Sequence, residues 1–142
     1  MPRTTRAIVV LLLTALLIPL AHTAAAQEAP VRIRVLDFGY MVVPPDPAAG
    51  PALSRAVAPL LAAHPSIALV DVGAQYMVSG MAAEGMGSQV RVDVRLVRVV
   101  DAEVVFKRQI VVDLQPGGES LADRVARELL AGMKEAKLIP ER

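Results

Sequence analysis

The stretch QVRVDVRLVRVVDAEVVFKRQIVVDL, residues 89–114, decides the fold of this 142-residue chain. Between positions 90 and 96, aliphatic residues alternate with charged ones, which is the period of a β-strand that buries one face. The phase slips at Val97, where we expect a β-bulge, and Asp101-Ala102 forms the next turn. After the turn, apolar residues again share one face. The stretch therefore predicts two antiparallel strands with one apolar and one charged face.

Two amphipathic helices are expected outside this hairpin. The first is expected to begin at Pro51, a favourable first helical residue, and to end near His64-Pro65. Its apolar stripe has helical spacing: Leu53, Val57, Leu60 and Leu61. The second follows Ser120 to Asp123, which resembles a capping box with Asp in the usual place of Glu. Its stripe consists of Ala122, Val125, Ala126, Leu129, Leu130 and Met133.

Three more strands complete the pattern, at residues 31–39, 67–72 and 75–85, with Gly80 as a bulge or a point of close contact. The proline-rich residues 40–51 are expected to form a loop. The order β-α-β-β-β-β-α predicts an α/β fold of the α+β sandwich type. In this fold a mixed, mostly antiparallel sheet carries the two amphipathic helices on one or both faces.

The N-terminus has the pattern of a secretory signal peptide. Arg3 and Arg6 precede an uncharged run at residues 7–20, and small residues lead to a cleavage site after Ala26. The run spans about 21 Å as a helix, which is shorter than the ~30 Å hydrocarbon core of a bilayer. We therefore expect residues 1–26 to be removed and residues 27–142 to form a single domain in the periplasm without a stable membrane span. The alternative is that the segment is retained as an anchor.

Composition narrows the function further. Removing Arg3 and Arg6 changes the net charge from +1 to −1, so the charge balance does not indicate a nucleic-acid partner. The chain has no Cys, which excludes disulfides and a cysteine-linked lipid anchor. His64 is the one histidine outside the signal segment, and a lone histidine is a poor metal or proton-transfer site. We predict no catalytic residue, no metal ligand and no cofactor.

Two groups of residues are candidates for binding a partner. Arg91 and Arg95 belong to a set of basic residues on polar strand faces, with Arg32, Arg34 and Lys107. This set either converges into a patch for an acidic partner or forms a solvated face with cross-strand ion pairs. The second group is apolar and lies in the expected loop: Tyr40, Met41, Val42 and Val43. These residues either tuck under the loop or form an exposed docking patch.

Several short segments resemble a known family. They are VLDF at residues 35–38, VDV at 70–72, QYMVSG at 75–80 and the hairpin sequence through the Asp101-Ala102 turn. Together with the last amphipathic helix, they resemble the TolB amino-terminal and CsgG-like domains of bacterial envelope proteins, and a related family of uncharacterised exported proteins. Gln75 stands where that family usually has Asp, and its Thr-Gly after the turn is missing here.

The resemblance implies an α/β domain that serves envelope assembly or transport without catalytic residues, and it transfers no site residue. Our expectation is an exported periplasmic accessory domain that binds an envelope protein and is able to form oligomers through its strand edges. One alternative is an auxiliary component of an export or lipid-transport system that binds an apolar ligand between sheet and helices. The other is an uncharacterised hydrolase.

Overall fold

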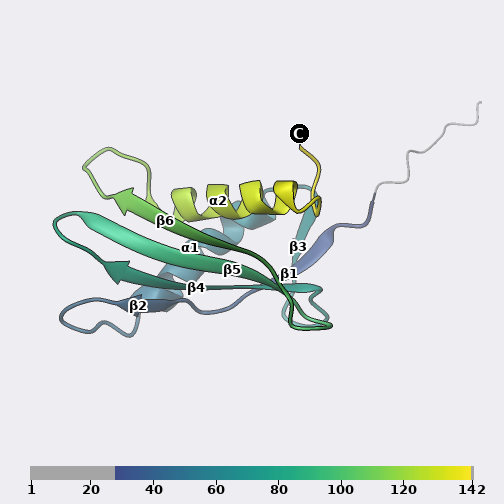
Figure 1. Cartoon of the computed structure of the whole chain (residues 1–142), viewed down its shortest axis with the longest axis horizontal. Coiled ribbons are helices and arrows are strands. Elements are labelled where there is room, and N and C mark those ends of the chain that lie inside the picture. The colour runs from purple at the N-terminus through teal and green to yellow at the C-terminus, as the bar shows by residue number, and fades with distance from the viewer. Residues whose placement is uncertain (1–27, 142) are drawn as a thin grey trace, which may run out of the picture.

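The computed structural model describes residues 28–141, so the expected signal peptide lies outside the described residues. These residues form one six-stranded mixed sheet and two helices, which confirms the predicted α+β fold class. Figure 1 shows how the elements are arranged. Their order is β1 (Val31–Val35), β2 (Gly39–Met41), α1 (Ala49–Ala62), β3 (Ile67–Leu69), β4 (Tyr76–Glu84), β5 (Gln89–Arg98), β6 (Val104–Asp113) and α2 (Leu121–Glu135).

The sheet has the strand order β3-β1-β4-β5-β6, and β2 pairs with β4 beyond the end of β1. The short strands β1, β2 and β3 form parallel pairings of three residue pairs each. The long strands β4, β5 and β6 are antiparallel, and each of their two pairings joins nine residue pairs. Most paired residues are therefore antiparallel, as the alternating sequence predicts.

The β-bulge falls where the alternation slips, between Leu96 and Val97. Gly80 is a point of close contact, because a Cβ at this position would lie 3.2 Å from both the Phe38 ring and the Asp93 carbonyl oxygen. The pairing of β4 with β5 runs through Gly80 without a shift, so the bulge alternative is wrong at this position.

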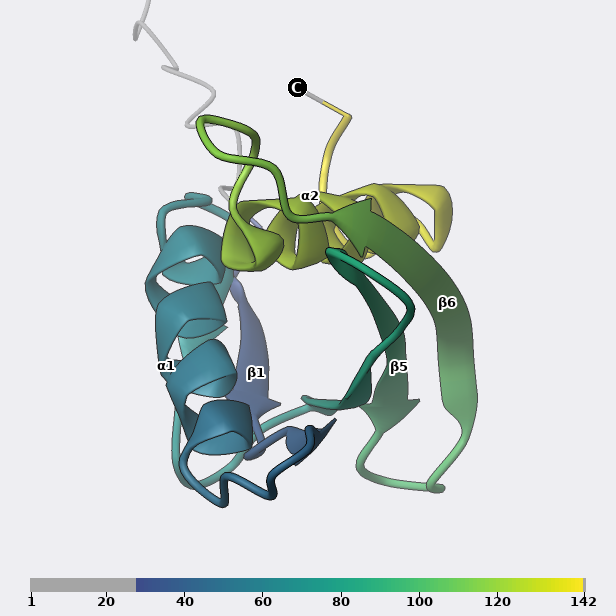
Figure 2. The same ribbon diagram turned by 90° about the vertical axis from the view of Figure 1, so that its left-hand side faces the viewer.

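Both helices contribute to one core on the same side of the sheet. Helix α1 packs against β3 and β2, and α2 packs against β6 and β5, while the two helices contact each other. Figure 2 shows α1 beside β1 and α2 across the top, next to β6. We call the helix-covered side the inner face. Most of its aliphatic strand residues are almost fully buried: Ile33, Val78, Ala82, Val90, Val92, Val94, Leu96, Ile110 and Val112.

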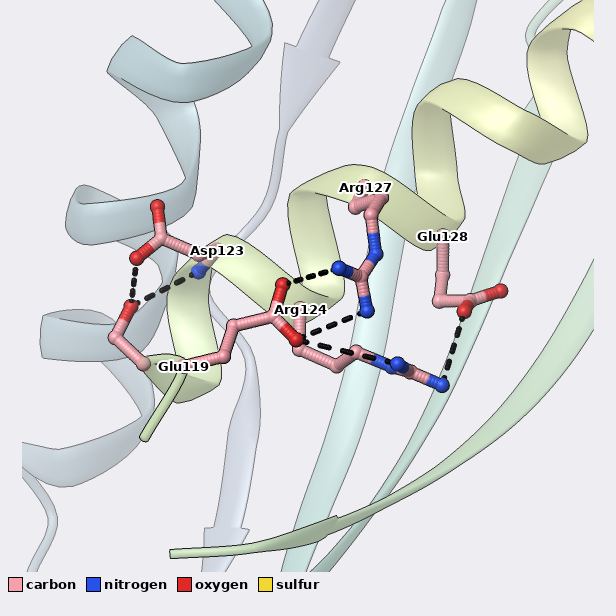
Figure 3. A network of polar contacts seen from close by, with 6 residues as sticks. Glu119, Asp123, Arg124, Arg127 and Glu128 are labelled. Carbon is pink, nitrogen blue, oxygen red and sulfur yellow. Dashed lines mark hydrogen bonds and ion pairs between the residues drawn. The ribbon is translucent and has the colours of Figure 1, made fainter. Parts of the chain in front are cut away.

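The predicted cap of the second helix is confirmed. Ser120 is the N-cap of α2, and its hydroxyl accepts the backbone N–H of Asp123 at 3.1 Å. The Ser120 hydroxyl also donates to the Asp123 carboxylate, so the two side chains are held together at the helix start. In Figure 3 this cap lies beside an ion network in which Glu119 contacts Arg124 and Arg127. The cap fixes where the apolar stripe of α2 begins.

Several boundaries differ from the sequence prediction. The strand expected at residues 31–39 ends at Val35, and the strand expected at 67–72 ends at Leu69. Helix α1 begins at Ala49, two residues before Pro51. The expected loop at residues 40–51 includes the last two residues of β2, because Tyr40 and Met41 pair with Ala82 and Ala83 of β4. A three-residue strand followed by prolines carries too little periodicity to be recognised in sequence, and only β4 supplies its hydrogen-bonding partner.

Candidate interaction surface

The face of the sheet opposite the helices is the candidate site, and we call it the outer face. The strand pairing shows which residues belong to this face, because the side chains of two directly paired residues lie on the same side of a sheet. The outer face comprises Arg32, Arg34, Gly39, Met41, Ala68, Met77, Ser79, Met81, Ala83, Gln89, Arg91, Asp93, Arg95, Val97, Val104, Lys107, Gln109, Val111 and Asp113. No helix of the described chain covers it.

The structure joins the two groups of candidate residues that are separate in the sequence. Met41 pairs with Ala83, and Ala83 pairs with Arg91, so Met41 and Arg91 lie on one face two strand spacings apart. This corresponds to about 10 Å between their Cα atoms. Arg95 lies on the same face, opposite Ser79 of β4 and Lys107 of β6.

The four apolar candidates divide between the two sides of the sheet. Tyr40 pairs with the buried Ala82 and packs against the core, so it tucks inward. Burial, and then the charge of Glu84, raises the pKa of the Tyr40 hydroxyl. Met41 is 62% exposed and Val43 is 92% exposed, whereas Val42 is half-buried. Met41 and Val43 are therefore the apolar residues of this segment that a partner can reach.

A buried hydroxyl anchors the same segment to α1. The Ser54 Oγ accepts the backbone N–H of Phe38 at 2.7 Å and donates to the Gly50 carbonyl at 3.2 Å. Gly50 allows this approach, because a Cβ there would lie 1.9 Å from the Phe38 carbonyl oxygen. These contacts hold the chain just before β2, and so they position Met41 at the rim of the outer face.

Charges on the outer face are only partly compensated. Arg91 forms an ion pair with Asp93 of the same strand at 3.2 Å, and the Arg95 Nε donates to the Ser79 hydroxyl at 2.9 Å. Within the described chain, Arg34 and Lys107 form no ion pair. Five cations and two carboxylates lie on this face, which therefore has a positive excess. Arg91 therefore has an ion-pair partner on this face, while the other cations are left to water or to a binding partner.

The centre of the outer face is hollowed. Ser79, Met81, Asp93, Arg95 and Lys107 line a depression of about 260 Å³. Arg95 and Lys107 are direct cross-strand neighbours in this depression. Like charges in such a position destabilise a sheet, and a nearby carboxylate offsets the repulsion, whether it is Asp93 in the same lining or an acidic group of a partner.

Sequence reasoning missed the methionines of β4. Met77 and Met81 are on the outer face, and Met81 is 46% exposed. The alternation of residues 76–84 divides them between the two faces of the sheet. The odd-numbered residues of β4 pair with odd-numbered residues of β5, which include Arg91, Asp93 and Arg95, so Met77 and Met81 share their face. Methionine is flexible and polarisable, which suits a surface that adapts to a partner.

His64, the histidine considered for metal binding or proton transfer, makes a local backbone contact. His64 lies at the end of α1, where its Nδ1 accepts the Ser66 backbone N–H at 3.2 Å. Among residues 28–141, no group of three His, Cys, Asp or Glu side chains is arranged to hold a metal ion. In this part of the chain no helix has the length and apolar character needed to cross a membrane.

Known proteins resemble this chain in their fold. No protein-family model and no curated protein sequence matches this chain. A PelC dodecamer from Paraburkholderia phytofirmans shares the fold with a TM-score of 0.57 at 18% identity, covering 70% of this chain and 86% of that chain. TolB from Acinetobacter baumannii has a TM-score of 0.52 at 14% identity, covering 78% of this chain and 28% of that chain.

Lipoprotein GNA1162 from Neisseria meningitidis has a TM-score of 0.50 at 12% identity, covering 80% of this chain and 100% of that chain. At these identities the likeness establishes a common fold. The fold is thus shared with TolB and with a bacterial lipoprotein, while the narrower resemblance to TolB amino-terminal or CsgG-like domains stays a prediction.

Proposed function

We propose that this chain is an exported, non-enzymatic accessory domain of the bacterial cell envelope that acts through protein–protein contacts. The proposal includes cleavage after Ala26 and a periplasmic location. The signal-peptide pattern supports export. The fold shared with a lipoprotein and with TolB supports a place in the envelope, and a narrower TolB-like or CsgG-like role belongs to the same proposal.

The observation that carries the proposal is the open outer face. Its inner counterpart is closed by α1 and α2, whereas the outer face presents a positive excess beside exposed methionines. A surface of this kind fits a partner segment with acidic and apolar side chains. Met41, Arg91 and Arg95 would contact this partner, with Val43 at the rim.

The apolar-ligand alternative has less support. Of the described methionines, Met133 lies in the core between sheet and helices, while Met41 and Met81 are exposed on the outer face. The inner face packs directly against apolar side chains of both helices, including Val57, Leu61 and Leu129. The methionines therefore favour contacts at the surface over a ligand in the core.

The test is crosslinking and affinity capture from the native envelope with charge-reversal variants. Arg91→Glu combined with Arg95→Glu should abolish capture of the partner, because both cations are exposed and neither supports the core. Arg55→Glu reverses one charge of the same kind on the exposed surface of α1 and should leave capture intact. Unchanged capture by the Arg91 and Arg95 double variant would show that the outer face is not the binding surface.

A further inference from the structure

The last strand of the sheet has a free side. β6 ends the strand order and pairs with β5 alone. The backbone N–H of Leu114 donates to the Ser88 carbonyl at 2.9 Å, which fixes the alternation of this antiparallel ladder. The even-numbered residues of β6 from 106 to 112 therefore bond to β5, and the backbone groups of Lys107, Gln109, Val111 and Asp113 point to the free edge. This edge is a template for another strand.

The free edge carries two opposite charges on its outer face. Lys107 and Asp113 lie six positions apart, and within residues 28–141 neither forms an ion pair. Hydrogen bonds from the Ser88 hydroxyl and then the Gln115 amide lower the pKa of the Asp113 carboxyl, so that it is an anion. Between the two charges, Val111 is 58% exposed.

This arrangement is self-complementary. If two β6 strands pair antiparallel about a two-fold axis at Ile110, residues equally far from Ile110 face each other. Lys107 then lies opposite Asp113 of the second copy, and the symmetry repeats the pair. Gln109 lies opposite Val111, and the two Val111 side chains become diagonal neighbours. These odd-numbered residues are also the ones with free backbone groups.

Other registers lose this complementarity. A shift of two residues in one direction places Lys107 opposite Val111, and a shift in the other direction places it opposite Gln115. A shift of one residue would pair edge-facing residues with residues that bond to β5, which the ladder alternation forbids. One register therefore satisfies both the charges and the backbone.

We propose that two copies of this chain pair antiparallel along β6, with the two-fold axis at Ile110, and form one continuous sheet. The pairing leaves the outer faces of both copies open on the same side of that sheet. A dimer would then present two copies of the cationic surface in a fixed arrangement. The inference goes beyond the proposed function and is independent of whether the outer face binds an acidic partner.

Charge-swap variants test the proposal by sedimentation velocity over a concentration series. Lys107→Asp and Asp113→Lys each replace two attractive pairs by two repulsive ones, so each should raise the dimer dissociation constant by about 10-fold or more. Combining them restores opposite charges across the axis and should recover the original dissociation constant. Arg55→Asp on α1 is the control and should leave it unchanged. Circular dichroism verifies that each variant folds.

Backbone amide exchange provides a second readout. On raising the concentration, the amides of Lys107, Gln109, Val111 and Asp113 should become protected, whereas the even-numbered amides from 106 to 112 are protected already by β5. Three results would overturn the proposal. They are a monomer at every concentration, a double variant as weak as the single ones, and a dimer whose odd-numbered β6 amides stay exchangeable. The last would place any dimer contact elsewhere.

Discussion

The two faces of β5 differ in what their side chains contact, although they alternate along one strand. Val92, Val94 and Leu96 are almost fully buried beneath the helices, while Arg91 and Arg95 are at the solvent. Each inner residue is surrounded by the core, and its removal leaves a cavity. Each outer residue contacts water and a few polar neighbours. The comparison indicates that stability depends on the inner face and leaves the outer face available for binding.

The largest expected effect comes from truncating the inner face. Leu96→Ala should lower the free energy of unfolding by about 2–5 kcal/mol, because Leu96 is fully buried. Arg95→Ala, one residue away on the outer face, should change it by about 0.5 kcal/mol or less. Urea denaturation of both variants measures the difference. Similar losses in the two variants would show that the faces do not divide stability in this way.

A smaller effect is expected at the one buried polar side chain among the described residues. Ser54 is 4% exposed, and Ser54→Ala would leave the Phe38 backbone N–H without its acceptor. The loss should be about 1–3 kcal/mol in the free energy of unfolding. Ser66→Ala is the control at a half-buried serine, and it should cost less. A neutral Ser54→Ala variant would mean that the segment before β2 finds another acceptor.

The turn joining β5 to β6 offers a stabilising change. Ala102 has a φ of 58°, a left-handed conformation that disfavours residues with a Cβ. Ala102→Gly should therefore raise the free energy of unfolding by up to about 1 kcal/mol, after the entropy that glycine adds to the unfolded chain. Ala52→Gly, on an exposed position of α1, should lower it by roughly 1 kcal/mol. Thermal unfolding should show a higher midpoint for Ala102→Gly and a lower midpoint for Ala52→Gly than for the parent chain.

The smallest expected effect concerns acid stability at the outer face. Hydrogen bonds from Ser88 and Gln115 lower the pKa of Asp113 below its usual value of 3.8. The stability that this carboxylate contributes is therefore present above pH 3.8 and is lost as the pH falls through the lowered pKa. Asp113→Asn should reduce the acid dependence of the urea midpoint slightly.

Ser88→Ala is the matched variant for this effect, since it removes the hydroxyl that donates to Asp113. Ser88→Ala should flatten the acid dependence less than Asp113→Asn, because Gln115 still donates to Asp113, and the double variant should match Asp113→Asn. Additive effects would indicate that Ser88 and Asp113 act on acid stability separately.

Local pattern predicted most of the fold. The strands β4, β5 and β6, the bulge after Leu96 and the Ser120 cap all follow from periodicity or from residue types at fixed spacing. The short strand β2 and its pairing with β4 did not, because three residues give no period. The sequence predicted that Arg91 and Arg95 lie on a polar face of the sheet, because they alternate with aliphatic residues. Its methionines needed the pairing of β4 with β5.

By itself, the sequence determined the apolar and charged faces of each long strand, the two helical stripes and the absence of cysteine chemistry. Side-chain alternation and helical period are local properties, so they can be recognised in a segment without knowing which other segments it packs against. Only the tertiary structure decided that both helices cover the same face, that Met41 and Arg91 share the other, and that β6 is left with a free edge. Those outcomes depend on pairing between segments far apart in the chain, which no local pattern encodes.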